Sequence, residues 1–176
     1  MVTREYDHHN LSKMSKSRLY DFILLHLRNL WAVDGLYYLN IEKEHGMKEA
    51  TIIDSRVWAS MGKIEARRLK DFFNIKKNDI PTVMDILQYT GWFLDMEDKE
   101  ITIQDDRGVI QNNNCRVQKT RIRKGLNEFP CKQVRLGFLE AFVREFNQDI
   151  KVECELCPPD EHPEDIWCRW CFYVDK

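Results

Sequence analysis

The sequence predicts an α+β domain in which N-terminal helices pack on a mostly antiparallel sheet. Apolar residues recur at helical spacing from about residue 16 to residue 90, and the pattern then changes to the alternation of strands. The last stretch, Lys151–Val174, holds two Cys-x-x-Cys pairs around a proline-rich insert. Helices followed by consecutive strands are the order expected of an α+β fold.

The composition is that of one globular domain. The chain has 176 residues, of which 43% are hydrophobic and 11% aromatic, enough to form a core. We expect a mobile tail over residues 1–15 and a single domain over 16–176, with a helical part at 16–90 and an α+β part at 91–176. No apolar run approaches the ~18 residues of a membrane span, and the polar N-terminus lacks a signal peptide. From these two observations we expect a cytoplasmic protein.

The charge balance gives no sign of a polyanionic partner. With 27 basic and 29 acidic residues the net charge is −2. Nucleic acids and anionic membranes are bound by strongly basic surfaces, so we expect neither as a partner. An exposed apolar helix face is suited to pairing two copies into a homodimer.

Three helices are expected in the first part. The first runs from about Lys16 to His45 and stops at Gly46, a residue typical of helix ends. The second runs from about Lys48 to Phe73. A third, short helix begins after Asp79, a favourable N-cap, and ends near Thr90.

The α+β part is expected to begin with three strands, Gly91–Met96, Glu100–Asp105 and Val109–Gln118, the last of which contains Cys115. A helix then begins at Cys131, after Pro130. Its apolar positions are Val134, Phe138, Ala141, Phe142 and Phe146.

The C-terminal segment predicts a β-hairpin with cysteines on both strands next to the connecting loop. The outer stretches KVECEL and IWCRWCFYV favour strands, and the prolines of the insert require a loop. On a regular strand, Cys154 and Cys157 point to opposite faces because the side-chain period is two. Either the strand bulges near Leu156, or one ligand of a metal comes from elsewhere in the chain.

Cys131 is the best outside candidate, because free N–H groups at a helix start stabilise a thiolate. The predicted zinc ligands are Cys131, Cys154, Cys157 and Cys168, with Cys171 and Cys115 in reserve. Four thiolates leave no open coordination position, so this zinc would be structural.

Several other residues are candidates for ligand binding. Arg121 and Arg123 could stabilise nearby thiolates or bind a carboxylate or phosphate of a ligand. Alternatively, they form part of a basic surface loop. Trp31 and Trp58 could line a small-molecule pocket, or belong to the core. A small-molecule-binding protein of unknown ligand is the leading interpretation.

His162 supports a different interpretation, that of a hydrolase. Such an enzyme would have three protein ligands and a zinc-bound water, with His162 or Asp160 as acid or base. His162 would otherwise pin its loop. A third interpretation is thiol redox or cofactor handling by Cys154 and Cys157.

The order of motifs in the last third resembles the 4-vinyl reductase domain. The resemblance is carried by Cys131, Gly137-Phe138, Cys157 and Cys168-Arg169-Trp170. It implies the fold of small transport-particle subunits and, in some relatives, a structural zinc beside a buried pocket for a small aromatic ligand. Those domains carry an acidic ligand three residues before the penultimate cysteine, and Cys154 occupies that position here.

Four longer stretches resemble an uncharacterised bacterial and archaeal family grouped with L-2-amino-thiazoline-4-carboxylic acid hydrolase-like proteins. They are LWAVDGLYYLNIEKEHG, WASMGKIEARRLK, GLNEFPCK and CPPDEHPEDIWCRW. This resemblance implies a metal-dependent hydrolase acting on a small cyclic amide or thiazoline-type substrate. The sequence shows no recognisable catalytic triad that would support this activity.

Overall fold

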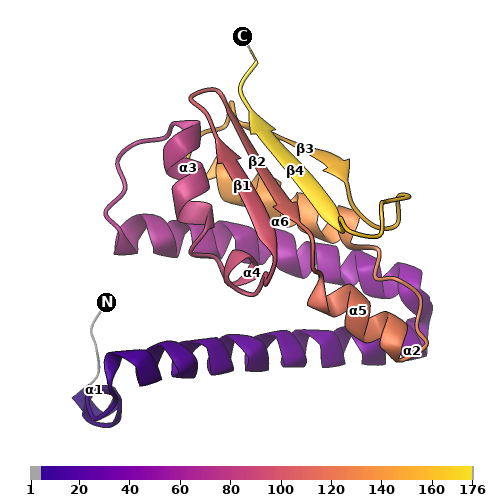
Figure 1. Cartoon of the computed structure of the whole chain (residues 1–176), viewed down its shortest axis with the longest axis horizontal. Helices are drawn as coiled ribbons and strands as arrows, with labels where there is room; N and C mark the ends of the chain where they lie inside the picture. The colour runs from indigo at the N-terminus through magenta and orange to yellow at the C-terminus, as the bar shows by residue number, and fades with distance from the viewer. Residues whose placement is uncertain (1–4, 176) are drawn as a thin grey trace.

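The computed structural model describes residues 5–175, which form six helices and one four-stranded sheet (Figure 1). In chain order these elements are α1 (Glu5–Leu11), α2 (Lys16–Phe72), α3 (Ile80–Leu87), α4 (Gly91–Leu94), β1 (Lys99–Ile103), β2 (Arg107–Asn112), α5 (Arg116–Arg123), α6 (Cys131–Arg144), β3 (Lys151–Leu156) and β4 (Cys168–Tyr173).

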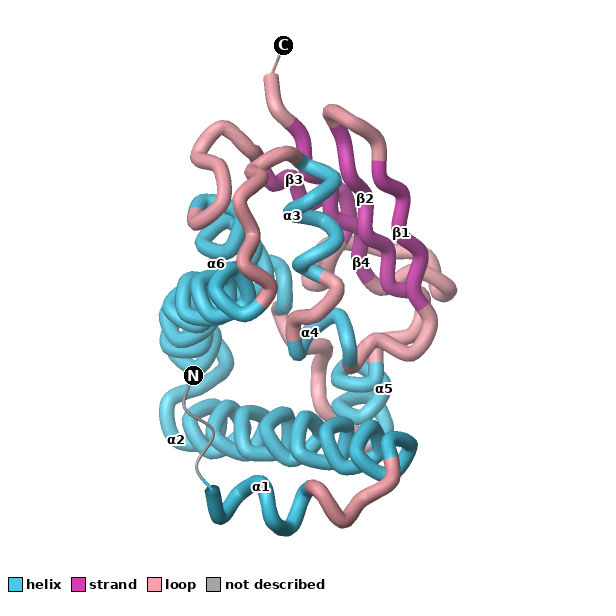
Figure 2. The backbone as a smooth tube through the Cα atoms, turned by 90° about the vertical axis from the view of Figure 1, so that its left-hand side faces the viewer, coloured by secondary structure: helices cyan, strands magenta, loops and turns pink. Residues whose placement is uncertain are grey.

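Helix α2 bends sharply at Gly46, where the backbone has φ 83° and ψ 162°. Glycine adopts this conformation at no steric cost, whereas other residues are strained there. The bend divides α2 into a first arm, residues 16–45, and a second arm, residues 47–72. Figure 2 shows the first arm running beneath α4 and α5. The predicted end of the first helix at Gly46 is therefore confirmed.

The sheet has the strand order β1-β2-β4-β3 and is antiparallel throughout. Helix α6 and the second arm of α2 lie behind it (Figure 1). The predicted fold class, helices packed on an antiparallel sheet, is confirmed. The largest fully buried side chains come from α3, α6 and the two central strands and include Trp170, Phe138, Phe142, Phe172, Ile80 and Ile110.

The predicted strand Gly91–Met96 is wrong, because this stretch begins with helix α4. The hydroxyl of Thr90 accepts a hydrogen bond from the backbone N–H of Phe93 at 3.3 Å. The carboxylate of Glu65 accepts one from the N–H of Gly91 at 2.9 Å. These two acceptors satisfy the free N–H groups of a helix start and so favour a helical turn over a strand.

The predicted strand Val109–Gln118 is correct only as far as Asn112. Helix α5 follows, and Cys115 is its N-cap rather than a strand residue. The side chain of Gln118 donates to the carbonyl of Phe129 and accepts from its N–H, both at 2.8 Å. This reciprocal pair holds α5 against the segment that leads into α6.

The N-terminal end is helical over Glu5–Leu11, within the stretch expected to be a mobile tail. Residues 1–4 lie outside the described part of the chain, and the mobility of the tail stays a prediction. Across residues 5–175, no helix combines the length and apolarity that crossing a bilayer requires.

Candidate metal centre

A bulge interrupts the pairing of β3 with β4 at the predicted place. Cys154 pairs with Trp170 and Leu156 with Arg169, so the register shifts between Cys154 and Leu156. An irregularity of this kind breaks the strict alternation of faces. The sequence left open either a bulge near Leu156 or a metal ligand from elsewhere in the chain, and the structure shows the bulge.

Cys157 lies at the centre of a cluster of four thiols. Its thiol interacts with the side chains of Cys131, Cys154 and Cys168, and these interactions together with burial raise the pKa of Cys157. The side chains of Cys157 and Cys168 are almost completely buried. The structure thus brings together the four cysteines that the sequence analysis selected.

Two of these thiols are easier to ionise than an ordinary cysteine. The hydrogen bond from Cys157, with help from the neighbouring guanidinium of Arg135, lowers the pKa of Cys131 to about 7. The same Cys157 bond, with the nearby Lys132 ammonium, lowers the pKa of Cys154. Positive charge and hydrogen bonds favour thiolates, the form that binds metals.

The insert loop and the start of α6 are tied to each other beside the thiols. The backbone N–H of Lys132, in the first turn of α6, donates to the carbonyl of Pro158 at 2.9 Å. The Lys132 ammonium also pairs with Asp160 at 2.5 Å. Because Cys157 immediately precedes Pro158, these contacts hold the two sides of the cluster together.

The two reserve cysteines, Cys171 and Cys115, have different surroundings from the four clustered thiols. Cys171 stands on the face of β4 opposite to Cys168 and Trp170, because side chains alternate along a strand. The charges that act on it come from Arg107 and from Glu155 and Glu153 of β3. Burial raises the pKa of Cys115 to about 12, and it interacts with Cys131 and Cys168 only through charge.

Among residues 5–175, no group of three or more His, Cys, Asp or Glu side chains is arranged as ligands around a metal ion. Zinc binding by this cluster therefore stays a prediction. All six cysteines are free thiols.

Arg135 is a functional candidate that the sequence analysis missed. It lies one helical turn after Cys131 and is 6% exposed, and its Nε and Nη1 atoms have no hydrogen-bond partner. Its guanidinium lies 4.7 Å from the ring centre of Trp92, 5.1 Å from Phe138 and 5.6 Å from Trp58. The four-residue spacing from Cys131 is the signal that could have revealed it.

Two acids, Asp34 of the first arm and Asp54 of the second, lie near Arg135, the first half-buried and the second buried. The indole N–H of Trp58 donates to Asp34 at 3.1 Å, which joins the second arm to the first. Burial, together with the charge of Asp34, raises the pKa of Asp54 to about 7. Burial also raises the pKa of Asp34.

Trp31 completes this cluster. Its ring stacks on that of Trp58 with centroids 4.9 Å apart, and its buried Nε1 atom has no hydrogen-bond partner. Trp31 and Trp58, both singled out from the sequence, thus lie together beside Arg135. We call Trp31, Trp58, Trp92 and Arg135 the tryptophan–arginine cluster.

The predicted basic candidates are not part of this cluster. Arg121 is buried and forms an ion pair with Glu42. Arg123 lies in the last turn of α5 and is exposed. The structure therefore gives Arg121 a structural partner and leaves Arg123 on the surface.

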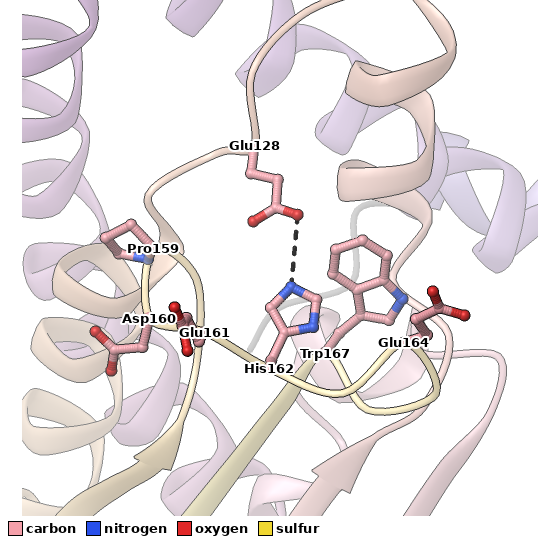
Figure 3. Close-up of a pocket in the computed structure, with 7 residues that line it drawn as sticks. All are labelled: Glu128, Pro159, Asp160, Glu161, His162, Glu164 and Trp167. Carbon is pink, nitrogen blue, oxygen red and sulfur yellow. Dashed lines mark ion pairs between the residues drawn. The ribbon is translucent and has the colours of Figure 1, made fainter.

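His162 lies in a separate surface hollow of about 630 Å³ (Figure 3). Its Nε2 is 3.5 Å from Glu128, and its ring centre is 4.7 Å from that of Trp167. These contacts pin the insert loop to the segment before α6. None of the seven residues that line the hollow is a cysteine: they are Glu128, Pro159, Asp160, Glu161, His162, Glu164 and Trp167.

The fold resembles that of a solved trafficking-particle subunit. A solved structure titled as a trafficking protein particle complex subunit 3 from Naegleria fowleri, covalently bound to palmitic acid, superimposes with a TM-score of 0.53 at 9% identity. The match covers 86% of this chain and 96% of that chain. At this identity the likeness shows the fold alone.

The chain belongs to a family of unknown function, DUF6125, whose model matches residues 11–174. No curated protein matches the sequence.

Proposed function

We propose that this protein binds a small molecule and that a structural zinc ion, held by Cys131, Cys154, Cys157 and Cys168, braces its C-terminal third. The observation that supports the proposal is that the side chains of Cys131, Cys154 and Cys168 all interact with that of Cys157. The resemblance to the 4-vinyl reductase domain points in the same direction.

The cluster has the chemistry that zinc requires. Zinc binds thiolates, and the lowered pKa values of Cys131 and Cys154 favour thiolates near neutral pH. Arg135 and Lys132 place positive charge next to the sulfurs and would offset the negative charge of the four thiolates. Once bound, the ion would link α6, β3 and β4, which meet at the cluster.

The tryptophan–arginine cluster is the proposed ligand site. Nearly all buried polar groups in proteins have hydrogen-bond partners, yet Trp31 Nε1 and two Arg135 nitrogens have none. An acceptor oxygen on a ligand would satisfy these donors, and the surrounding rings would contact an apolar body. We therefore propose a small aromatic molecule that carries a carboxylate or another acceptor oxygen.

Native mass spectrometry of the purified protein tests this ligand directly, since a co-purified molecule adds its mass to the chain. Benzoate and its neutral analogue benzamide serve as probes when no molecule co-purifies. Arg135→Gln and Trp31→Phe should each weaken benzoate binding at least tenfold. Trp167→Phe is the matched control, because the Nε1 of Trp167 is also unpartnered but this residue lines the surface hollow around His162. Equal loss in all three variants would contradict the proposed site.

The hydrolase and redox interpretations are less well supported. A catalytic zinc needs an open coordination position, which four cysteines do not leave. His162 contacts Glu128 and Trp167 in a hollow without cysteines. Thiol titration before and after chelation separates the redox interpretation from zinc, since zinc-bound thiolates react only after the metal is removed.

A further inference from the structure

We propose that two copies of the chain pair through the first arms of their α2 helices, side by side and antiparallel. This inference does not depend on the zinc or the ligand. It begins from the exposure of the first arm, on which eight large apolar side chains are each 44–70% exposed. They are Tyr20, Ile23, Leu24, Leu25, Leu30, Val33, Leu36 and Tyr37.

Four of these residues form a continuous stripe. Ile23, Leu30, Val33 and Tyr37 follow one another at spacings of seven, three and four residues. That is the spacing by which two helices interlock along a common seam. We call these four residues the outer stripe; Leu25 and Leu36 flank it.

Another side of the arm is already engaged by the rest of the chain. Trp31 stacks on Trp58, and Tyr38 bonds to Thr51 at 2.9 Å. Glu42 pairs with Arg121. A helix with apolar residues on both sides is normally buried on both sides. The inner side packs on its own domain, and the outer stripe therefore needs a partner.

The outer stripe together with Leu25 and Leu36 is large enough for a modest dimer. Six large apolar side chains, each exposing about half its surface, present on the order of 600 Å² per copy. Two such faces bury roughly 1,200 Å², the lower end of specific interfaces. We therefore expect a dimer that dissociates on dilution.

The charges at the ends of the arm favour a second copy in the antiparallel orientation. Lys16 and Arg18 lie at its beginning, and Glu44 lies at its end, next to the bend. In an antiparallel pair centred on Leu30, Lys16 of each arm comes opposite Glu44 of the other, because both lie fourteen residues from Leu30. A two-fold arrangement of this kind is closed and uses the same surface on both copies.

Sedimentation velocity of the full chain over a range of concentrations tests the interface. The wild type should change from monomer to dimer with rising concentration. Leu30→Glu should weaken the dimer at least a hundredfold without loss of helical circular dichroism. Phe72→Ser is the matched control, because Phe72 is 74% exposed but lies at the end of the second arm. A wild type that stays monomeric, or a Leu30→Glu variant that dimerises normally, would overturn the proposal.

Charge exchange tests the orientation. The double variant Lys16→Glu, Arg18→Glu places acid against Glu44 of the other copy, so the dimer should weaken at least tenfold. Adding Glu44→Lys should restore it. In a parallel pair the same end of each arm meets itself, and the added change would bring no recovery. Lack of recovery therefore refutes the antiparallel arrangement.

Discussion

Arg121 of α5 donates two parallel hydrogen bonds to the carboxylate of Glu42 in the first arm, from Nη1 to Oε2 and from Nη2 to Oε1, both 2.8 Å long. The two side chains are only 7% and 17% exposed. The Nε of Arg121 also donates to the carbonyl of Asn127 at 2.7 Å, and its guanidinium lies over the ring of Tyr38. This network fastens the first arm to the α+β part of the molecule.

Arg121→Met should lower the free energy of unfolding by about 3–5 kcal/mol, because it leaves a buried carboxylate without its partner. Urea denaturation followed by circular dichroism measures the change. Arg67→Met is the matched control, since Arg67 is 60% exposed in its pair with Glu145. Its loss should stay within about 1 kcal/mol. Similar losses in both variants would contradict a structural role specific to Arg121.

Gly62→Ala should destabilise the protein by about 1–3 kcal/mol. A Cβ atom at this position would lie 2.3 Å from the carbonyl oxygen of Phe138, where α2 crosses α6. The backbones of α2 and α6 would have to move apart to make room for this atom. Gly35→Ala is the counterpart, because a Cβ there meets no atom within 4 Å. It should stabilise the helix by about 0.5–1 kcal/mol. Thermal melts that show the same sign for both would refute this close crossing.

The stability should depend on pH through Asp54, whose pKa is raised to about 7 by burial. The folded state holds this proton more tightly than the unfolded chain does. Protonated Asp54 therefore stabilises the fold at low pH, and this contribution is lost as the pH rises through about 7. Asp54→Asn keeps the shape without the charge.

The free energy of unfolding of Asp54→Asn should exceed that of the wild type at pH 8 by on the order of 3 kcal/mol. The difference should shrink towards pH 4. Urea denaturation at pH 4, 6 and 8 provides the comparison. A difference that is constant with pH would show that Asp54 does not titrate in this range.

Local patterns predicted much of this fold. The N-cap Asp79 accepts from the N–H of Thr82 at 2.9 Å, as its position before a proline-containing helix suggested. Gly46 ends the first arm, and the spacing of Cys154 and Cys157 indicated the bulge near Leu156 as one of two alternatives. In each case the reason lies within a few neighbouring residues.

The features that were missed depend on distant parts of the chain. Helix α4 is capped partly by Glu65, which precedes Gly91 by 26 residues. Helix α5 is held by the backbone of Phe129. In the sequence, Arg135 looks like an ordinary helix residue. Its burial among aromatic rings results from the packing of α6 against the second arm of α2. Periodicity carries no information about such contacts.

The central claim is that four sulfurs hold one zinc ion, and native mass spectrometry combined with elemental analysis tests it most directly. The wild type should carry one zinc per chain. Cys131→Ser should lose it and melt at a lower temperature, whereas Cys171→Ser, buried on the other face of β4, should keep it. A wild type purified without zinc that also fails to bind added zinc would contradict the account, as would full zinc content in Cys131→Ser.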